Sequence, residues 1–503
     1  MPGNFFEAIT EVAAARPEAP FLILPGRGML DYRATLEIAA RFARVLSARG
    51  VAPGDRVMVQ TGKSAETLCL YLACLGIGAV YVPLNTGYTA SEVAYFAGDA
   101  EPEVFVCAPE SRERIAAAAP GATVLTLSDD GRQGSLPEEA ARQPPDFPRA
   151  GVRMNDLASI LYTSGTTGRS KGAMLSHGNL WSNAETLRDI WRYSSGDVLL
   201  HALPIFHIHG LFVATNVSLV AGAAMILLPK FEVNEIFRWL PEASVMMGVP
   251  TFYTRLLQDP RLTPDAVRHM RLFVSGSAPL LADTHRQWQQ RTGHAILERY
   301  GMTETGMIAS NPYDGARVPG TVGHALPGVD VRVADEAGRA LPPGAVGMIE
   351  VKGPNVFWGY WRMPDKTREE FRPDGHFITG DLGVMEADGR LSIVGRGKDL
   401  IITGGFNVYP KEIESLIDAL EGVEESAVIG VAHPDFGEGV TAVVVRGDPA
   451  LTEAAVLAAL GEHLARFKCP KRVLFVDGLP RNTMGKVQKA ILREQYRALY
   501  GNG

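Results

Sequence analysis

The chain has 503 residues, of which 46% are hydrophobic and 21% are charged. This is the composition of a globular protein, and the length exceeds what one hydrophobic core usually holds, so we expect about two to four domains. The net charge of −7, spread over both signs, leaves no basic field for nucleic acid or anionic lipid, and we exclude nucleic acid and membranes as partners.

The first segment with a clear pattern runs from residue 54 to residue 109. It predicts strands at 54–60, 79–84 and 103–109, with amphipathic helices at 64–78 and 89–100 between them. Residues 196–250 repeat this plan in spacing though not in residue identity. Two βαβαβ units of this kind predict a doubly wound α/β body, whose chemistry lies in loops at the carboxyl ends of the strands.

Residues 210–229 carry no charge over a length that could span a bilayer. We interpret them instead as a buried helix, a turn at Gly222 and a buried strand of a covered parallel sheet. The cysteines Cys69, Cys74, Cys107 and Cys469 have neither the spacing of a metal site nor the density of a disulfide scaffold, and the first twenty residues lack the pattern of a signal peptide. We therefore expect a cytoplasmic protein with no disulfide partner and no membrane span.

Short β runs and turns between about residues 320 and 395 predict a mostly antiparallel subdomain. A final unit of about one hundred residues follows, enough for an independent small α+β domain. Within it, we expect strands at 424–432 and 472–477 and a helix at 452–467.

Residues 161–175, LYTSGTTGRSKGAML, are typical of a phosphate-binding loop. Glycines free consecutive backbone N–H groups to point at one anion, hydroxyls and two cations stand beside them, and a strand precedes them. It is not a Walker A loop, because Arg169 and Ser170 separate Gly168 from Lys171. The alternative is a solvated turn.

Further motifs carry groups suited to a nucleotide. Tyr300 can stack on a base, Thr303 can bind a phosphate and the Glu304 carboxylate suits a hard cation. Asp381 suits a ribose diol, and Arg396 suits the same ribose or a phosphate.

Together these stretches resemble the adenylate-forming acyl-CoA synthetases, or AMP-binding superfamily. The matching segments are YTSGTTGRSKG, ALPIFHIHG, GSAPL, ERYGMTE, ITGDLG, GRGKDLIITGGFNVYPKEIE and PRNTMGKV, in the family's order between about residues 160 and 490. The segments ERYGMTE, MGVPTFYTRL and SNPYDGARVPGTVG resemble the malonyl-CoA synthetase subgroup. The resemblance implies ATP, Mg²⁺ and coenzyme A as cofactor and co-substrates.

The resemblance also implies roles for individual residues. Thr163 and Glu304 would hold Mg²⁺, Thr303 would contact the α-phosphate, and Lys486 would bridge the attacking carboxylate and the α-phosphate. The β- and γ-phosphates would be held by Thr163, Ser164, Gly165, Thr166, Thr167, Gly168 and Lys171, the adenine by Gly276, Ser277, Ala278 and Tyr300, and the ribose by Asp381 and Arg396.

Because the thiol must approach where the Lys486 loop sits during adenylation, the resemblance implies that a C-terminal domain swings between the two half-reactions. We expect an N-terminal domain at 1–395, a hinge at 396–398 that contains Lys398, and a mobile domain at 399–503. The hinge would bring Gly404, Gly405 and Phe406 to the pantetheine tunnel; a plain β-turn is the alternative reading of these residues.

The acid implied by the resemblance is malonate, with methylmalonate as a weaker substrate. Arg255 and Arg299 would pair with its distal carboxylate, and His209, Ser277 and Met307 would line its pocket. His207 is a candidate catalytic residue, although either histidine could equally be a structural hydrogen-bonding group. Alternatives are that the arginines are surface residues or brace Glu298 or Asp314, and that the protein activates another carboxylic acid or loads a carrier protein.

Overall fold

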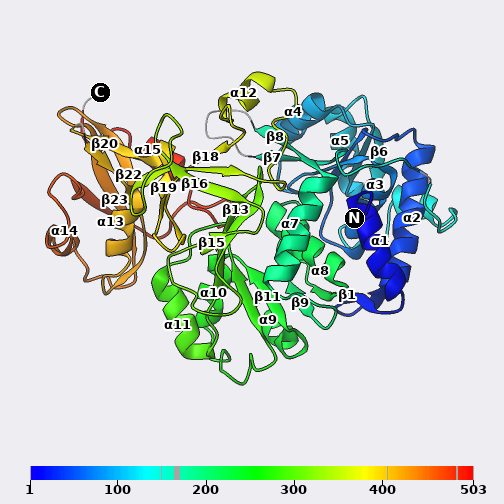
Figure 1. Ribbon diagram of the computed structural model, residues 1–503, viewed down its shortest axis with the longest axis horizontal. Coiled ribbons are helices and arrows are strands. Elements are labelled where there is room, and N and C mark those ends of the chain that lie inside the picture. The colour runs from blue at the N-terminus through cyan, green and yellow to red at the C-terminus, as the bar shows by residue number, and fades with distance from the viewer. Residues whose placement is uncertain (1, 149, 164–169, 405, 483–484, 502–503) are drawn as a thin grey trace.

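The computed structural model describes residues 2–148, 150–163, 170–404, 406–482 and 485–501. Two large sheets and the helices around them form the N-terminal body, a four-stranded sheet follows, and a smaller C-terminal domain lies at one end of the molecule (Figure 1). This is the predicted class, an α/β body with a β-rich part and a small α+β domain. No helix in these ranges combines the length and apolarity needed to cross a membrane.

The first predicted βαβαβ unit is confirmed and lies in a six-stranded sheet. The sheet has the order β6 (Thr123–Thr126), β5 (Val104–Cys107), β3 (Arg56–Gln60), β4 (Val80–Pro83), β7 (Leu157–Thr163) and β8 (Lys171–Ser176). Its helices are α3 (Ala65–Ile77), which begins with a Ser64 cap and ends at Gly78 in the left-handed region, and α4 (Ala90–Ala100), which has a Thr89–Glu92 capping box.

The second unit is confirmed in a nine-stranded sheet. Its order is β15 (His324–Ala325), β14 (Gly306–Ser310), β13 (Leu297–Met302), β12 (Leu272–Ser275), β11 (Val245–Gly248), β9 (Val198–His201), β10 (Ala224–Leu227), β1 (Pro20–Leu24) and β2 (Gly28–Asp31). The apolar run at 210–229 forms the π-helix His209–Thr215, α8 (Asn216–Ala221), the predicted turn at Gly222 and β10. Each unit thus places its first strand, β3 or β9, between the next two.

The main hydrophobic core lies between these two sheets. Strand residues alternate between it and a core on the outer face: Val57 and Val59 face the main core, whereas Met58 faces the core beneath α4. The main core also takes side chains from α1 (Phe5–Ala15), α2 (Tyr32–Ala48), α3, α7 (His177–Ile190) and α8. The outer face of the nine-stranded sheet is covered by α9 (Val233–Trp239), α10 (Pro250–Leu257) and α11 (Ala282–Thr292). Shorter helices are α5 (Arg112–Ala118) and α6 (Ser135–Ala140).

The β-rich part is an antiparallel sheet of β16 (Asp330–Ala334), β17 (Val346–Lys352), β18 (Phe377–Met385) and β19 (Leu391–Arg396), with α12 (Pro364–Glu369) between β17 and β18. In the C-terminal domain, β20 (Ile401–Thr403), β21 (Phe406–Val408), β22 (Val423–His433), β23 (Gly437–Arg446) and β24 (Arg472–Val476) form one sheet. Its helices are α13 (Pro410–Ile417), α14 (Glu453–Gly461) and α15 (Lys489–Gln495). The helix expected at 452–467 is shorter than predicted, since α14 ends at Gly461, a residue that weakens helices.

Candidate active site

A cluster of polar side chains around one buried arginine, which we call the Arg299 cluster, lies at the carboxyl ends of the central strands of the nine-stranded sheet. Arg299 comes from β13, which runs parallel to β12, and Gly276 and Ser277 follow the end of β12. His207 and His209 follow β9 at the start of the π-helix. The parallel strands therefore bring together residues that are about ninety positions apart in the sequence.

Arg299 is the central residue of the Arg299 cluster. Its side chain is buried, yet Nε and one terminal guanidinium nitrogen have no hydrogen-bond partner, and it forms no ion pair with any carboxylate of the described residues. Burial lowers the pKa of Arg299 to about 9. A Cβ on Gly276 would lie 2.3 Å from Arg299 Cζ, so only glycine leaves room for the guanidinium there. Such an unpaired buried cation is costly and suits an anionic ligand.

The two histidines are held neutral beside Arg299. Burial and the positive charges of Arg299 and Lys486 lower the pKa of His207 to about 4, and burial and Arg299 lower that of His209 well below its ordinary value. His209 Nδ1 lies 3.2 Å from Ser277 Oγ, and its buried Nε2 has no partner. Ser277 has a φ of 70°, a strained conformation for a residue other than glycine, and strain of this kind is concentrated at functional sites.

The two predicted arginines are placed differently. Arg299 and His209 are buried and His207 is half-buried, whereas Arg255 is exposed in the last turn of α10. Exposure does not support the predicted role of Arg255 in binding a buried carboxylate. Neither proposed brace involves Arg299, because Glu298 contacts His285 and Asp314 pairs with Arg192. Met307 is buried on β14, opposite Gly301.

The expected adenosine-binding residues lie together where β13 approaches the four-stranded sheet. Asp381 and Arg396 face each other across β18 and β19, with Arg396 Nε 2.6 Å from Asp381 Oδ1. Tyr300 Oη donates to Asp381 Oδ2 at 2.6 Å. Ala278 is half-buried after β12.

Lys486 reaches this region from the C-terminal domain. Burial lowers its pKa to about 8; Arg396 and Lys398 also lower it, while Asp381 and Asp399 oppose the shift. Thr251 of α10 lies 3.4 Å from where a Cβ on Gly485 would stand, so this loop contacts the N-terminal body. The structure thus brings Lys486 to Asp381 and His207, although more than one hundred residues separate it from either of them in the sequence.

Glu304, in the turn between β13 and β14, fits a divalent cation. It is a buried carboxylate, burial raises its pKa, and none of the described cations pairs with it directly. Its Oε1 lies 3.1 Å from Tyr360 Oη. Thr163 is half-buried at the end of β7, and Thr303 is half-buried beside Glu304. Because Mg²⁺ takes one or two carboxylates together with substrate phosphates, this donor set suits it better than a site built wholly from protein.

Part of the predicted phosphate loop and of the tunnel segment lies within the described residues. Lys171 begins β8 and opposes Thr163, and Gly404 and Phe406 belong to the β20–β21 hairpin. Phe406 is 55% exposed and stacks on Phe467. The predicted residues Ser164, Gly165, Thr166, Thr167, Gly168 and Gly405 lie outside the described residues.

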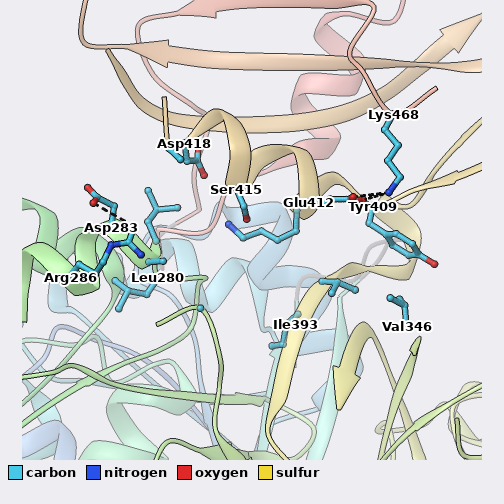
Figure 2. A pocket seen from close by; sticks show the side chains of 16 residues that line it. Leu280, Asp283, Arg286, Val346, Ile393, Tyr409, Glu412, Ser415, Asp418 and Lys468 are labelled. Carbon is cyan, nitrogen blue, oxygen red and sulfur yellow. Dashed lines mark hydrogen bonds and ion pairs between the residues drawn. The ribbon is translucent and has the colours of Figure 1, made fainter. Parts of the chain in front are cut away.

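A cavity of about 530 Å³ separates the C-terminal domain from the N-terminal body (Figure 2). Asp283 and Arg286 of α11 line one side, and Glu412 and Ser415 of α13 line the other, together with Asp418 directly after that helix. Neither Arg299 nor Lys486 is among its lining residues, so this cavity is distinct from the Arg299 cluster.

Tyr360 and Glu370, which were not among the predicted site residues, contact Glu304 and Lys171. Tyr360 Oη donates to Glu370 Oε2 at 2.6 Å, and Lys171 Nζ lies 2.9 Å from Glu370 Oε1. No local signal marks these residues, because the contact joins segments 199 residues apart.

Comparison with known proteins identifies the family to which this sequence and fold belong. The AMP-binding enzyme family matches residues 9–361, and the AMP-binding enzyme C-terminal domain matches residues 412–486. The crystal structure of ATP-bound MatB from Rhodopseudomonas palustris is 60% identical, covers 100% of both chains and has a TM-score of 0.98. A malonate–CoA ligase of Arabidopsis thaliana is 36% identical over 88% of this chain and 78% of that protein. A feruloyl-CoA synthase of Amycolatopsis sp is 37% identical over 94% of this chain and 95% of that protein. The match over most of the chain shows that this protein belongs to the family of AMP-binding enzymes, the adenylate-forming superfamily that its motifs resemble.

Proposed function

We propose that this protein ligates malonate to coenzyme A with ATP, through a malonyl-adenylate, and yields malonyl-CoA, AMP and pyrophosphate. The observation that carries the proposal is Arg299, a buried guanidinium with unpaired donors and no carboxylate partner in the described residues. The distal carboxylate of malonate supplies the missing charge, and it can accept two hydrogen bonds from one guanidinium.

The relatives support malonate, because a malonate–CoA ligase of Arabidopsis thaliana is 36% identical to this chain and MatB from Rhodopseudomonas palustris is 60% identical, whereas a feruloyl-CoA synthase is 37% identical. The electrostatics of the Arg299 cluster favour the dicarboxylate. A neutral aromatic ring or the methyl group of acetate would leave Arg299 buried and unpaired, a penalty of several kcal/mol. His209 and Ser277 add polar groups beside it. We propose methylmalonate as a weaker substrate.

In the proposed first half-reaction, a malonate carboxylate oxygen attacks the α-phosphorus of ATP, and pyrophosphate leaves. Lys486 would stabilise the charge that develops between the carboxylate and the α-phosphate, with Thr303 beside it. Asp381 and Arg396 would hold the ribose, and Tyr300, Gly276, Ser277 and Ala278 would enclose the adenine. We propose His207 as a further polar contact to the reacting groups, as a neutral imidazole, because its pKa is about 4.

Thr163 and Glu304 would hold Mg²⁺, which neutralises phosphate charge when bound. Lys171 and the loop from Ser164 to Gly168 would hold the β- and γ-phosphates.

In the second half-reaction, the thiol of coenzyme A attacks the acyl carbon and AMP leaves. We propose that the domain at 399–503 rotates about the hinge at 396–398, which includes Lys398, and carries Gly404, Gly405 and Phe406 toward the thiol's path. Exposure of Phe406 supports this, because in the present orientation its ring is not covered by the N-terminal body.

The charges of the C-terminal domain support the same motion. Its ion pairs in the described residues join partners within the domain, among them Glu412 with Lys468 and Asp399 with Arg493. Across the cavity of Figure 2, Asp283 likewise pairs with Arg286 of its own helix. Separating the two faces of this cavity therefore breaks neither the Glu412–Lys468 pair nor the Asp283–Arg286 pair.

We place the enzyme in a reducing compartment, the cytoplasm, because all four cysteines are free.

A screen for CoA-dependent AMP release over malonate, methylmalonate, acetate, propionate, succinate and ferulate tests the proposal. We expect the highest kcat/KM for malonate, with AMP and pyrophosphate in equal amounts. A preference for acetate or ferulate would exclude the malonate assignment, and release of ADP with phosphate would exclude the adenylate mechanism itself.

A further inference from the structure

Lys171 is already paired with a carboxylate. Its Nζ lies 2.9 Å from Glu370 Oε1 and 4.0 Å from the centre of the Tyr360 ring, where a cation is attracted by the aromatic face. The Tyr360 hydroxyl contacts Glu370 Oε2 at 2.6 Å and Glu304 Oε1 at 3.1 Å. We call Lys171, Glu370, Tyr360 and Glu304 the Lys171 network. It joins β8, the segments on either side of α12 and the turn after β13 into one connected set.

This pairing is more than a surface contact. The side chains of Lys171 and Glu370 are only 16% and 21% exposed. Burial by itself would raise the pKa of Glu370, but Lys171 and Tyr360 hold it below its ordinary value, so the carboxylate is ionised. The proposed function assigns the same Lys171 ammonium to the β- and γ-phosphates of ATP. Glu370 therefore binds the same ammonium group that the phosphates of ATP would bind.

We propose that Glu370 is an internal counter-ion of Lys171 that the terminal phosphates of ATP compete with and displace, and that recaptures Lys171 as pyrophosphate leaves. This inference rests on the proposed function, since it requires that Lys171 binds these phosphates. Glu370 is a positioning residue in this scheme, because it acts on the substrate only through Lys171.

The surroundings of Glu370 make the exchange feasible. When Lys171 turns to a phosphate, Glu370 keeps Lys366 Nζ, 3.2 Å from Oε1, and the Tyr360 hydroxyl on Oε2. The carboxylate is therefore not left buried and unpaired, which would be strongly unfavourable. Lys171 can likewise change partner by side-chain rotation while β8 stays paired with β7.

The scheme predicts a gain in affinity on mutation, which a merely structural role would not produce. In Glu370→Gln, Lys171 has no competing charge, so Mg·ATP should bind more tightly by about threefold to tenfold, the range of a partly exposed charged contact. AMP lacks the β- and γ-phosphates, so its affinity should not change. Pyrophosphate should become a stronger product inhibitor by a similar factor.

The test is isothermal titration calorimetry of the full-length protein with Mg·ATP, and separately with AMP, in the absence of acid and coenzyme A. The matched control is Glu369→Gln, which removes a neighbouring carboxylate that is 66% exposed and should leave both affinities unchanged. Glu370→Ala, a second variant, should shift the Mg·ATP affinity in the same direction as Glu370→Gln. Lys171→Ala should weaken Mg·ATP and not AMP.

The outcomes separate the two levels of the argument. If Lys171→Ala weakens Mg·ATP while both Glu370 variants leave it unchanged or weaker, the counter-ion role is wrong and the phosphate role of Lys171 stands. If Lys171→Ala leaves Mg·ATP affinity unchanged, the phosphate assignment fails and takes the counter-ion role with it. Tightening of Mg·ATP alone in Glu370→Gln supports both.

Discussion

Replacing Arg299 by methionine tests the acid specificity most directly. The substitution keeps a long apolar side chain in the Arg299 cluster but removes the guanidinium. Removing one partner of a buried ion pair costs about 3–5 kcal/mol. Because each 1.36 kcal/mol corresponds to about tenfold in rate, kcat/KM for malonate should fall by roughly 150-fold to 5,000-fold.

The same change should affect acetate in the opposite sense. Wild-type enzyme must leave Arg299 unpaired when acetate binds, whereas Arg299→Met has no charge to leave unpaired, so kcat/KM for acetate should be unchanged or higher. The affinity for ATP should be retained, because Asp381, rather than Arg299, pairs with Arg396 in the adenosine region. The melting temperature should not fall, since an unpaired buried guanidinium contributes no ion pair to the folded state.

The assay is CoA-dependent AMP release with malonate and acetate in parallel, with thermal unfolding of each variant. Arg255→Met is the matched control: because Arg255 is exposed, we expect a loss below about tenfold for malonate. An equal loss with malonate and acetate, or full malonate activity in Arg299→Met, would refute the reasoning.

Three further predictions concern the proposed two-step cycle. Lys486→Ala should reduce malonyl-adenylate formation by about 10²-fold or more while attack of coenzyme A on supplied adenylate survives, and comparable loss of both half-reactions would argue against its role. The rate of adenylation should decrease as pH rises through about 8, because the Lys486 ammonium loses its proton there. His207, with a pKa of about 4, should cause no change in this rate between pH 6 and 8. Stopped-flow measurement of pyrophosphate release against pH checks this, and Lys486→Arg should shift the decrease to higher pH. Lys398→Pro fixes φ near about −65° and should leave adenylation nearly normal while thioester formation drops strongly, so rapid thioester formation in this variant would exclude residue 398 as the hinge.

The sequence predicted the two βαβαβ units because their signals are local. The strands at 56–60, 80–83 and 104–107 are short, apolar and buried, and the helix between the first two has Ser64 before it and Gly78 after it. Packing then needs only the rules that parallel strands neighbour one another and that their connections are right-handed.

Side-chain placement was harder to predict than chain order. Arg255 and Arg299 both stand near strand ends in the sequence, but Arg255 points away from the core on α10, and only the packing of β12 against β13 buries Arg299. Glu370 is one of two adjacent acidic residues in the sequence, and its contact with Lys171 depends on a long-range arrangement of β8 and the segment after α12. Such contacts are decided by tertiary geometry, which periodicity does not encode.

Because the ion pairs formed by the described part of the C-terminal domain join partners within that domain, its orientation should respond little to ionic strength. Salt screens the attraction between oppositely charged side chains. In this protein, that attraction acts more within the C-terminal domain than between it and the N-terminal body. The equilibrium between orientations is then set by differences in how tightly each orientation binds its ligands. Nucleotide, adenylate and thiol would thus act as successive effectors of one rotation, so the order of the two half-reactions would follow from the order in which ligands arrive.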